Sequence, residues 1–183
     1  MNFKHRKNQV GTLTSKVGVY ILCDLENVPV YVGQSRDGIR ARVQRHLTSA
    51  RSDIIANRQL DVWEIAYVWA YPVENKAEIG GLEARLFHFF NPKSQLMTGK
   101  IPQSIGELTA IPEPSQVVQV MEEEDRIEKL KVEQRLPRKA KQYADIVSHF
   151  LAVKNSDEIS RAMDAHFVRL KKYHELMVNL AAK

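Results

Sequence analysis

The first patterned part of the chain is a pair of β-branched and aromatic runs. Residues 17–23, Val-Gly-Val-Tyr-Ile-Leu-Cys, are typical of a strand with at least one buried face. Residues 24–27, Asp-Leu-Glu-Asn, indicate a turn, because Asp and Asn tolerate turn geometry and bond their own backbone. Residues 28–33 form the returning strand, with Pro29 at its start or on a sheet edge because proline lacks a backbone donor. Together the two runs predict a β-hairpin.

The next two segments predict a helix and a third strand. Residues 38–49 carry Ile39, Val43 and Leu47 at positions i, i+4 and i+8, which is one helical stripe. A polar loop follows, and residues 61–71 are again aromatic and β-branched, which favours a strand that ends at Pro72.

A second helix is predicted between this strand and Pro92. Asn75-Lys-Ala-Glu78 has the N-x-x-E form of a capping box. The apolar residues that follow at helical spacing are Ile79, Leu82, Leu86, Phe87 and Phe90. The order β-β-α-β-α predicts an α+β fold, a small antiparallel three-stranded sheet flanked by helices.

The second half of the chain has a different pattern. Residues 99–115 contain three prolines and two glycines and indicate an irregular linker between a domain over residues 10–98 and a helical C-terminal region over residues 116–183. Within that region we expect a helix over residues 116–136, an interruption at Pro137, a second helix over residues 138–153, and a third that begins with the N-x-x-E sequence at Asn155.

The charged residues are unevenly distributed along the chain. The chain has 183 residues and a formal net charge of +5. The first hundred residues hold 14 Lys and Arg against 9 Asp and Glu, whereas the remainder holds 13 of each. An anionic partner such as nucleic acid would therefore dock on the first half, although a merely basic soluble surface explains the charge equally well.

Composition excludes several other classes of protein. The single cysteine, Cys23, excludes an internal disulfide framework and a zinc site built from several thiolates. No apolar stretch approaches the roughly 18 residues that a membrane helix needs, so we expect no membrane partner. The basic residues 1–7 lead into no hydrophobic signal core, and a cytoplasmic location is expected.

Chemistry-bearing residues gather around the predicted hairpin. Tyr20 and Tyr31 each stand beside a glycine, in Gly-Val-Tyr over residues 18–20 and Tyr-Val-Gly over residues 31–33, and paired strands bring such side chains within reach of each other. Arg42 and His46 lie at i and i+4 and therefore share one face of the following helix. Glu83 stands within the apolar stripe of the second helix, an awkward place for a carboxylate that has no role there. Each of these residues alone would more often be structural, and only their joint order favours function.

This order resembles the GIY-YIG nuclease family. Gly-Val-Tyr and Tyr-Val-Gly stand where the two tripeptide motifs would be, and Arg42 followed by Val43, with His46 one turn later, is similar to the family's helix. Leu-Glu-Ala around Glu83, followed by Asn91-Pro92, is similar to its metal-binding glutamate helix and terminating proline. The resemblance covers residues 17–95.

The resemblance implies roles for specific residues. The catalytic residues would be Tyr20, Tyr31, Arg42, His46 and Glu83, with Glu83 also the ligand of Mg²⁺ or Mn²⁺. The substrate-binding residues would be Gln34, Arg40, Arg45, Asn91 and Gln95. The sequence departs from the family at two of these: Gln34 stands where repair-type members have lysine, and Gln95 where an asparagine is common.

The implied activity is divalent-metal-dependent hydrolysis of DNA phosphodiester bonds, with RNA as another substrate that the chemistry allows. In that reaction Tyr20 would help to activate water, and because a free Tyr has a pKa of about 10, Arg42 and the metal would have to lower that pKa. The alternative is a non-catalytic nucleic-acid-binding or assembly module on the same fold. The apolar faces of the C-terminal helices argue equally for packing on the first domain or for homodimerisation.

Overall fold

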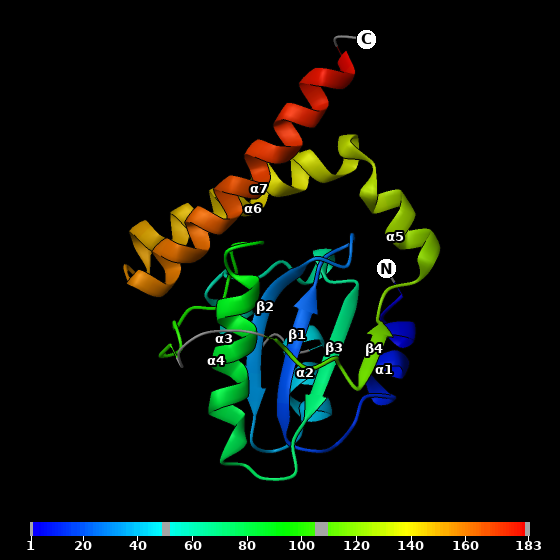
Figure 1. Cartoon of the computed structure of the whole chain (residues 1–183). Helices are drawn as coiled ribbons and strands as arrows, with labels where there is room; N and C mark the ends of the chain where they lie inside the picture. The colour runs from blue at the N-terminus through cyan, green and yellow to red at the C-terminus, as the bar shows by residue number, and fades with distance from the viewer. Residues whose placement is uncertain (1, 49–51, 105–109, 182–183) are drawn as a thin grey trace.

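The computed structural model describes residues 2–48, 52–104 and 110–181, and a four-stranded antiparallel sheet lies at its centre (Figure 1). The strands are β1 (Gly18–Cys23), β2 (Pro29–Ser35), β3 (Tyr67–Pro72) and β4 (Gln116–Gln119), in the spatial order β2-β1-β3-β4. The prediction of an α+β fold is confirmed, but the prediction of three strands is wrong.

The fourth strand is the segment that the sequence pattern assigned to the start of a helix. β4 pairs with β3 so that Val118 lies opposite Val68, and two adjacent valines suit a strand better than a helix. The glutamate-rich stretch just after it dominated the pattern and concealed a strand of only four residues. The third strand is also shorter than predicted, because residues 62–64 form a 3-10 turn, η1 (Val62–Glu64), before β3 begins.

Helices cover both faces of the sheet. α4 (Glu78–Phe90) packs on one face, and α1 (Phe3–Gly11) and α2 (Ile39–Thr48) lie on the other, with the short α3 (Asp53–Ala56) after α2 (Figure 1). β1 is buried along its whole length, as a central strand covered on both sides must be. The sequence pattern did not predict α1, because this helix is polar and buries only Arg6 and Val10.

The C-terminal region is helical, as expected, but its boundaries differ from the predicted ones. α5 (Glu123–Leu130), α6 (Val132–Ala152) and α7 (Asp157–Ala181) follow β4, and α6 packs along α7 across one end of the sheet (Figure 1). Pro137 lies inside α6 rather than between two helices. The break falls at Lys131, whose ψ of 130° is extended, six residues earlier than predicted.

Neither predicted cap has the expected form. The Asn75 side chain accepts a hydrogen bond from the backbone N–H of Ala77 at 2.9 Å, and Ala77 itself caps α4. At the start of α7, Ser156 rather than Asn155 accepts from the backbone, at 3.4 Å from the Ile159 nitrogen. None of the described helices is both long and apolar enough to cross a membrane.

A buried ionic cluster attaches the C-terminal helices to the sheet. Arg135 of α6, with a side chain only 1% exposed, contacts Asp24 at 2.8 Å, Glu26 at 2.8 Å and Glu64 at 3.0 Å. Lys139 lies 3.0 Å from Glu64, and these cations lower the pKa of Glu64 to about 2 despite its burial. The cluster joins α6 to the turn of the β1–β2 hairpin, which makes the helices part of the same folded body.

Replacing Arg135 with alanine is predicted to lower the free energy of unfolding by about 3–5 kcal/mol, because the substitution leaves three carboxylates without their shared cation. The exposed pair of Lys141 and Asp145 offers a matched control, and Lys141→Ala should cost less than about 1 kcal/mol. Urea denaturation of both variants checks this. Equal losses in the two variants would contradict the stabilising role of the cluster.

Candidate active site

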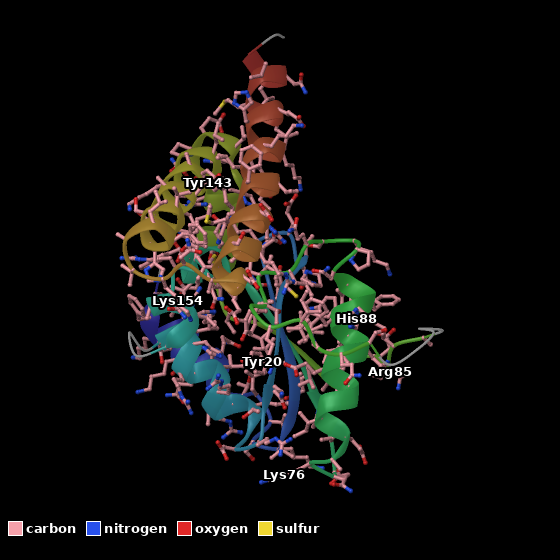
Figure 2. All side chains as sticks on the ribbon, turned by 90° about the vertical axis from the view of Figure 1, so that its left-hand side faces the viewer. Tyr20, Lys76, Arg85, His88, Tyr143 and Lys154 are labelled. Carbon is pink, nitrogen blue, oxygen red and sulfur yellow. The ribbon has the colours of Figure 1, made fainter. Side chains whose placement is uncertain are left out.

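A pocket of about 660 Å³ opens along the β2 edge of the sheet. Strand residues from β1 and β2, helix residues from α2 and α4, and the loop after α4 line it together: Tyr20, Tyr31, Val32, Gly33, Gln34, Arg42, Gly80, Glu83 and residues 98–103. Figure 2 shows Tyr20 between α2 and α4 in a view onto this side of the molecule. The structure therefore brings together four of the five predicted catalytic residues at the surface of one pocket, and His46 lies directly behind them.

The two motif glycines are required by close approaches to their neighbours. Tyr20 lies opposite Gly33 in the β1–β2 register. A Cβ atom on Gly33 would lie 2.6 Å from the Tyr20 hydroxyl oxygen and 2.7 Å from the Tyr31 ring. Gly18 has a φ of +152°, and a Cβ there would lie 2.2 Å from the Tyr71 carbonyl oxygen. Gly33 thus leaves room for the two phenol rings, whereas Gly18 leaves room for the backbone of β3.

Tyr20 and Tyr31 stack with 6.2 Å between ring centroids, and Tyr20 continues into a buried polar chain. His46 Nε2 lies 2.8 Å from the Tyr20 hydroxyl, and His46 Nδ1 lies 2.7 Å from the Ser52 hydroxyl. His46 and Ser52 are fully buried. Nothing in the sequence pattern pointed to Ser52, which lies in a segment predicted only to be a polar loop.

Burial raises the pKa of Tyr20 well above its ordinary value, and Tyr31 adds to this rise. Arg42 acts in the opposite direction, through its charge and a hydrogen bond, but its effect is smaller than that of burial. Arg42 alone therefore leaves the pKa of Tyr20 above its ordinary value, and the expected lowering by Arg42 together with a metal ion would depend on the metal ion. At neutral pH the Tyr20 phenol holds its proton and can donate or relay it.

Glu83 faces the pocket from α4 and is half-buried. Burial raises its pKa above the usual value, and Gln34 Nε2 donates a hydrogen bond to Glu83 Oε2 at 2.9 Å. No group of three or more His, Cys, Asp or Glu side chains within the described ranges could hold a metal ion. A single carboxylate beside open space fits Mg²⁺, because this ion keeps several waters and can take further oxygen ligands from a bound phosphate. The same arrangement does not fit a closed zinc site, in which protein side chains supply all the ligands.

The loop after α4 closes one side of the pocket, and the sequence pattern had assigned most of it to the linker. Thr98 Oγ1 accepts from the Val32 backbone N–H at 2.9 Å and donates to the Val32 carbonyl at 3.0 Å. This pairing satisfies the exposed edge of β2 where it borders the pocket. Lys100 follows in the same loop and places a further cation at the pocket wall.

The predicted substrate-binding residues are divided among three places. Gln34 lines the pocket. Arg40 donates from Nε to the Leu13 carbonyl at 2.6 Å, and Arg45 is exposed on α2; neither residue lines the pocket. Asn91 and Gln95 line a neighbouring groove.

Comparison with known proteins agrees with this geometry. Residues 16–95 match the model of the GIY-YIG catalytic domain. This match supports the resemblance to the GIY-YIG nuclease family, and the matched segment contains every predicted catalytic residue. GIY-YIG nucleases are nucleic-acid hydrolases that generally use divalent metal ions. No curated protein matches the chain.

Gly33→Ala is predicted to destabilise the protein by about 1–3 kcal/mol, because the added methyl group must displace the Tyr20 and Tyr31 rings. The control is Gly80→Ala on α4, where a Cβ meets nothing within 4 Å and alanine favours the helix. Thermal or urea unfolding distinguishes the two. A Gly33→Ala protein as stable as the wild type would show that the rings do not require this glycine.

Proposed function

We propose that this protein is a divalent-metal-dependent endonuclease that hydrolyses DNA phosphodiester bonds in the pocket at the β2 edge. The observation that carries the proposal is the convergence of two phenols, a guanidinium and a carboxylate on one open pocket, from four different elements. The family match supplies the reaction class, and the side chains present suit it.

Arg42 would bind the scissile phosphate. Its planar guanidinium carries a permanent charge and can donate two parallel hydrogen bonds to phosphate oxygens. In the hydrolysis of a phosphodiester, charge increases on these oxygens in the transition state, so a cation held beside them accelerates the reaction. Arg42 lies on the pocket wall and close to the Tyr20 hydroxyl.

Tyr20 and His46 would take up the proton of the attacking water: the Tyr20 hydroxyl would accept it and pass its own proton to His46 Nε2, while His46 Nδ1 donates to the Ser52 hydroxyl. The hydroxyl of Tyr20 is at hydrogen-bond distance from His46, and His46 is at hydrogen-bond distance from Ser52. Because the pKa of Tyr20 is raised, the phenol is more readily a member of a relay than a base that is already ionised. Tyr31, stacked on Tyr20 at the pocket wall, holds the ring in place.

Glu83 would hold the cation, either Mg²⁺ or Mn²⁺. A bound divalent ion supplies Lewis acidity and stabilises the developing negative charge. Gln34 occupies one carboxylate oxygen of Glu83 and leaves the other available. A neutral amide at this position keeps the carboxylate oriented and adds no positive charge that would compete with a divalent ion.

Glu83→Gln is predicted to lower the cleavage rate by roughly 100-fold or more, because the substitution removes the charged ligand. Glu78→Gln, at an exposed position in the first turn of the same helix, is the matched control and should cleave normally. The assay uses plasmid DNA and matched deoxyribo- and ribo-oligonucleotides with Mg²⁺ or Mn²⁺. Binding without nicking under either metal would contradict the proposal and indicate the binding module instead.

At a divalent-ion concentration below saturation, the cleavage rate is predicted to fall on acidification, starting at a higher pH than for an ordinary glutamate. Glu83 must be ionised to hold the cation, and burial raises its pKa above 4.5, so protonation inactivates the site earlier in an acid titration. Single-turnover rates measured across the acidic range, with circular dichroism at each pH to confirm folding, test this. A rate that stays level down to pH 4.5 would contradict the role of Glu83.

A further inference from the structure

A second groove, of about 580 Å³, lies where the end of α4, the turn between β1 and β2, and α7 meet. Four cationic side chains line it, and they come from two distant parts of the chain: Lys93 after α4, and Arg161, Arg169 and Lys172 on α7. Asn91 and Gln95, for which the family resemblance implies substrate binding, lie on its wall.

The two arginines of this groove are bound only to neutral acceptors among the described residues. Arg169, which is 9% exposed, donates to the Gln95 carbonyl at 2.9 Å, the Ala165 carbonyl at 3.0 Å and the Ser94 hydroxyl at 2.9 Å. Arg161 donates to the carbonyls of Thr98 at 3.1 Å and Gly99 at 2.9 Å. Neither guanidinium forms an ion pair with a carboxylate in the part of the chain that the structure describes.

Arg169 is buried and Arg161 is partly buried without a carboxylate at ion-pair distance, and the more remote charge of Asp24 offsets this only in part at Arg169. Desolvation lowers the pKa of Arg161 and of Arg169, which means that the surroundings disfavour the charged form. A buried charge is stable when an opposite charge approaches it. An anion in the groove would remove this penalty, whereas an apolar or cationic occupant would not.

Nearby carboxylates do not neutralise the groove. Asp24 lines it, but its Oδ2 is 2.8 Å from Arg135. Glu26 lies 3.3 Å from Lys172 but also 2.8 Å from Arg135 and accepts a hydrogen bond from Tyr173 at 2.7 Å. Positive charge therefore remains in excess along the groove.

The groove adjoins the active-site pocket. Ile101 lines both cavities, and Lys100 beside it lines the pocket. Arg161 of the groove holds the carbonyls of Thr98 and Gly99, which belong to the loop that closes the pocket. Cations therefore line both adjoining cavities: Arg42 and Lys100 line the pocket, and Lys93, Arg161, Arg169 and Lys172 line the groove.

We propose that this groove binds the phosphodiester backbone of the substrate strand beside the scissile bond, so that α7 is a nucleic-acid-binding element of the enzyme. The inference rests on the proposed nuclease function and adds a second binding region to it. A phosphate chain supplies the repeated single charges that fit cations placed at intervals, and phosphate contacts of this kind fix position without reading sequence.

The test compares lysine variants of equal charge change. Lys93→Gln combined with Lys172→Gln removes two exposed cations from the groove, whereas Lys141→Gln combined with Lys171→Gln removes two exposed cations elsewhere on α6 and α7. Binding is measured by fluorescence anisotropy without divalent ions, so that no cleavage occurs, on single-stranded oligonucleotides of about 4 and about 16 nucleotides.

The groove variant should bind the longer oligonucleotide roughly tenfold more weakly than the control variant, and its slope of log K against log salt should fall by about 0.7 for each lost phosphate contact. The shorter oligonucleotide, which the pocket alone can hold, should be affected less. Circular dichroism and urea denaturation of both variants establish that they fold.

Equal affinity and equal salt slope in the two variants would overturn the groove proposal, even where the wild type cleaves DNA and Glu83→Gln does not. Loss on the short oligonucleotide equal to that on the long one would also overturn it, because the lysines would then act at the pocket. If the wild type binds the oligonucleotides through the groove but does not cleave DNA, the nuclease proposal alone is overturned. A wild type that binds neither oligonucleotide would remove both.

Discussion

The close contact between Tyr20 and Gly33 across the first two strands is the constraint on which the site depends. The hydroxyl oxygen of Tyr20 occupies the space that any side chain at position 33 would take, so the pairing admits only glycine there without displacement of the ring. Because the contact fixes the depth and direction of the ring, it also fixes where His46 and Ser52 can meet the hydroxyl. The two tripeptide motifs and the buried chain of Tyr20, His46 and Ser52 are thus parts of one packing arrangement.

The position of β2 at the edge of the sheet explains how residues from opposite faces reach one pocket. Tyr31 and Arg42 belong to the face that α2 covers, whereas Glu83 belongs to α4 on the other face. A central strand would separate these groups, but an edge strand lets them meet around its open side. Thr98 pairs with the backbone of β2 and closes the edge beyond the site. The loop that lines the pocket after α4 is also held by Arg161 of α7, which donates to the carbonyls of Thr98 and Gly99.

Much of the first domain could be predicted because its elements follow strict local patterns. The two runs of β-branched and aromatic residues indicated the hairpin, and the spacing of Ile39, Val43 and Leu47 indicated α2. The residues of the pocket were predicted from their order, which resembles a family, and not from physics alone. Features that depend on tertiary contacts were missed: β4 exists because β3 has a free edge, and α1 is held by Arg6, which donates to the carbonyls of Val62 and Ile65.

The roles of Ser52, Thr98 and the groove arginines were also missed, because they depend on contacts that form only in the folded chain. Nothing near Ser52 in the sequence marks it as a partner of His46, and the carbonyl partners of Arg161 lie more than sixty residues away. The break at Lys131 instead of Pro137 has a similar origin, because Arg135, Arg138 and Lys139 must share one helix to reach Glu64. Ion pairing with Glu64 in η1 therefore favours a continuous α6 through the proline.

The most direct test of the central claim is a crystal structure of the Glu83→Gln protein with an uncleaved DNA oligonucleotide. The account predicts a backbone phosphate in the pocket at the β2 edge, within hydrogen-bond distance of the Arg42 guanidinium and beside the Tyr20 and Tyr31 rings. DNA bound on another face of the molecule, with the pocket filled by solvent alone, would contradict it.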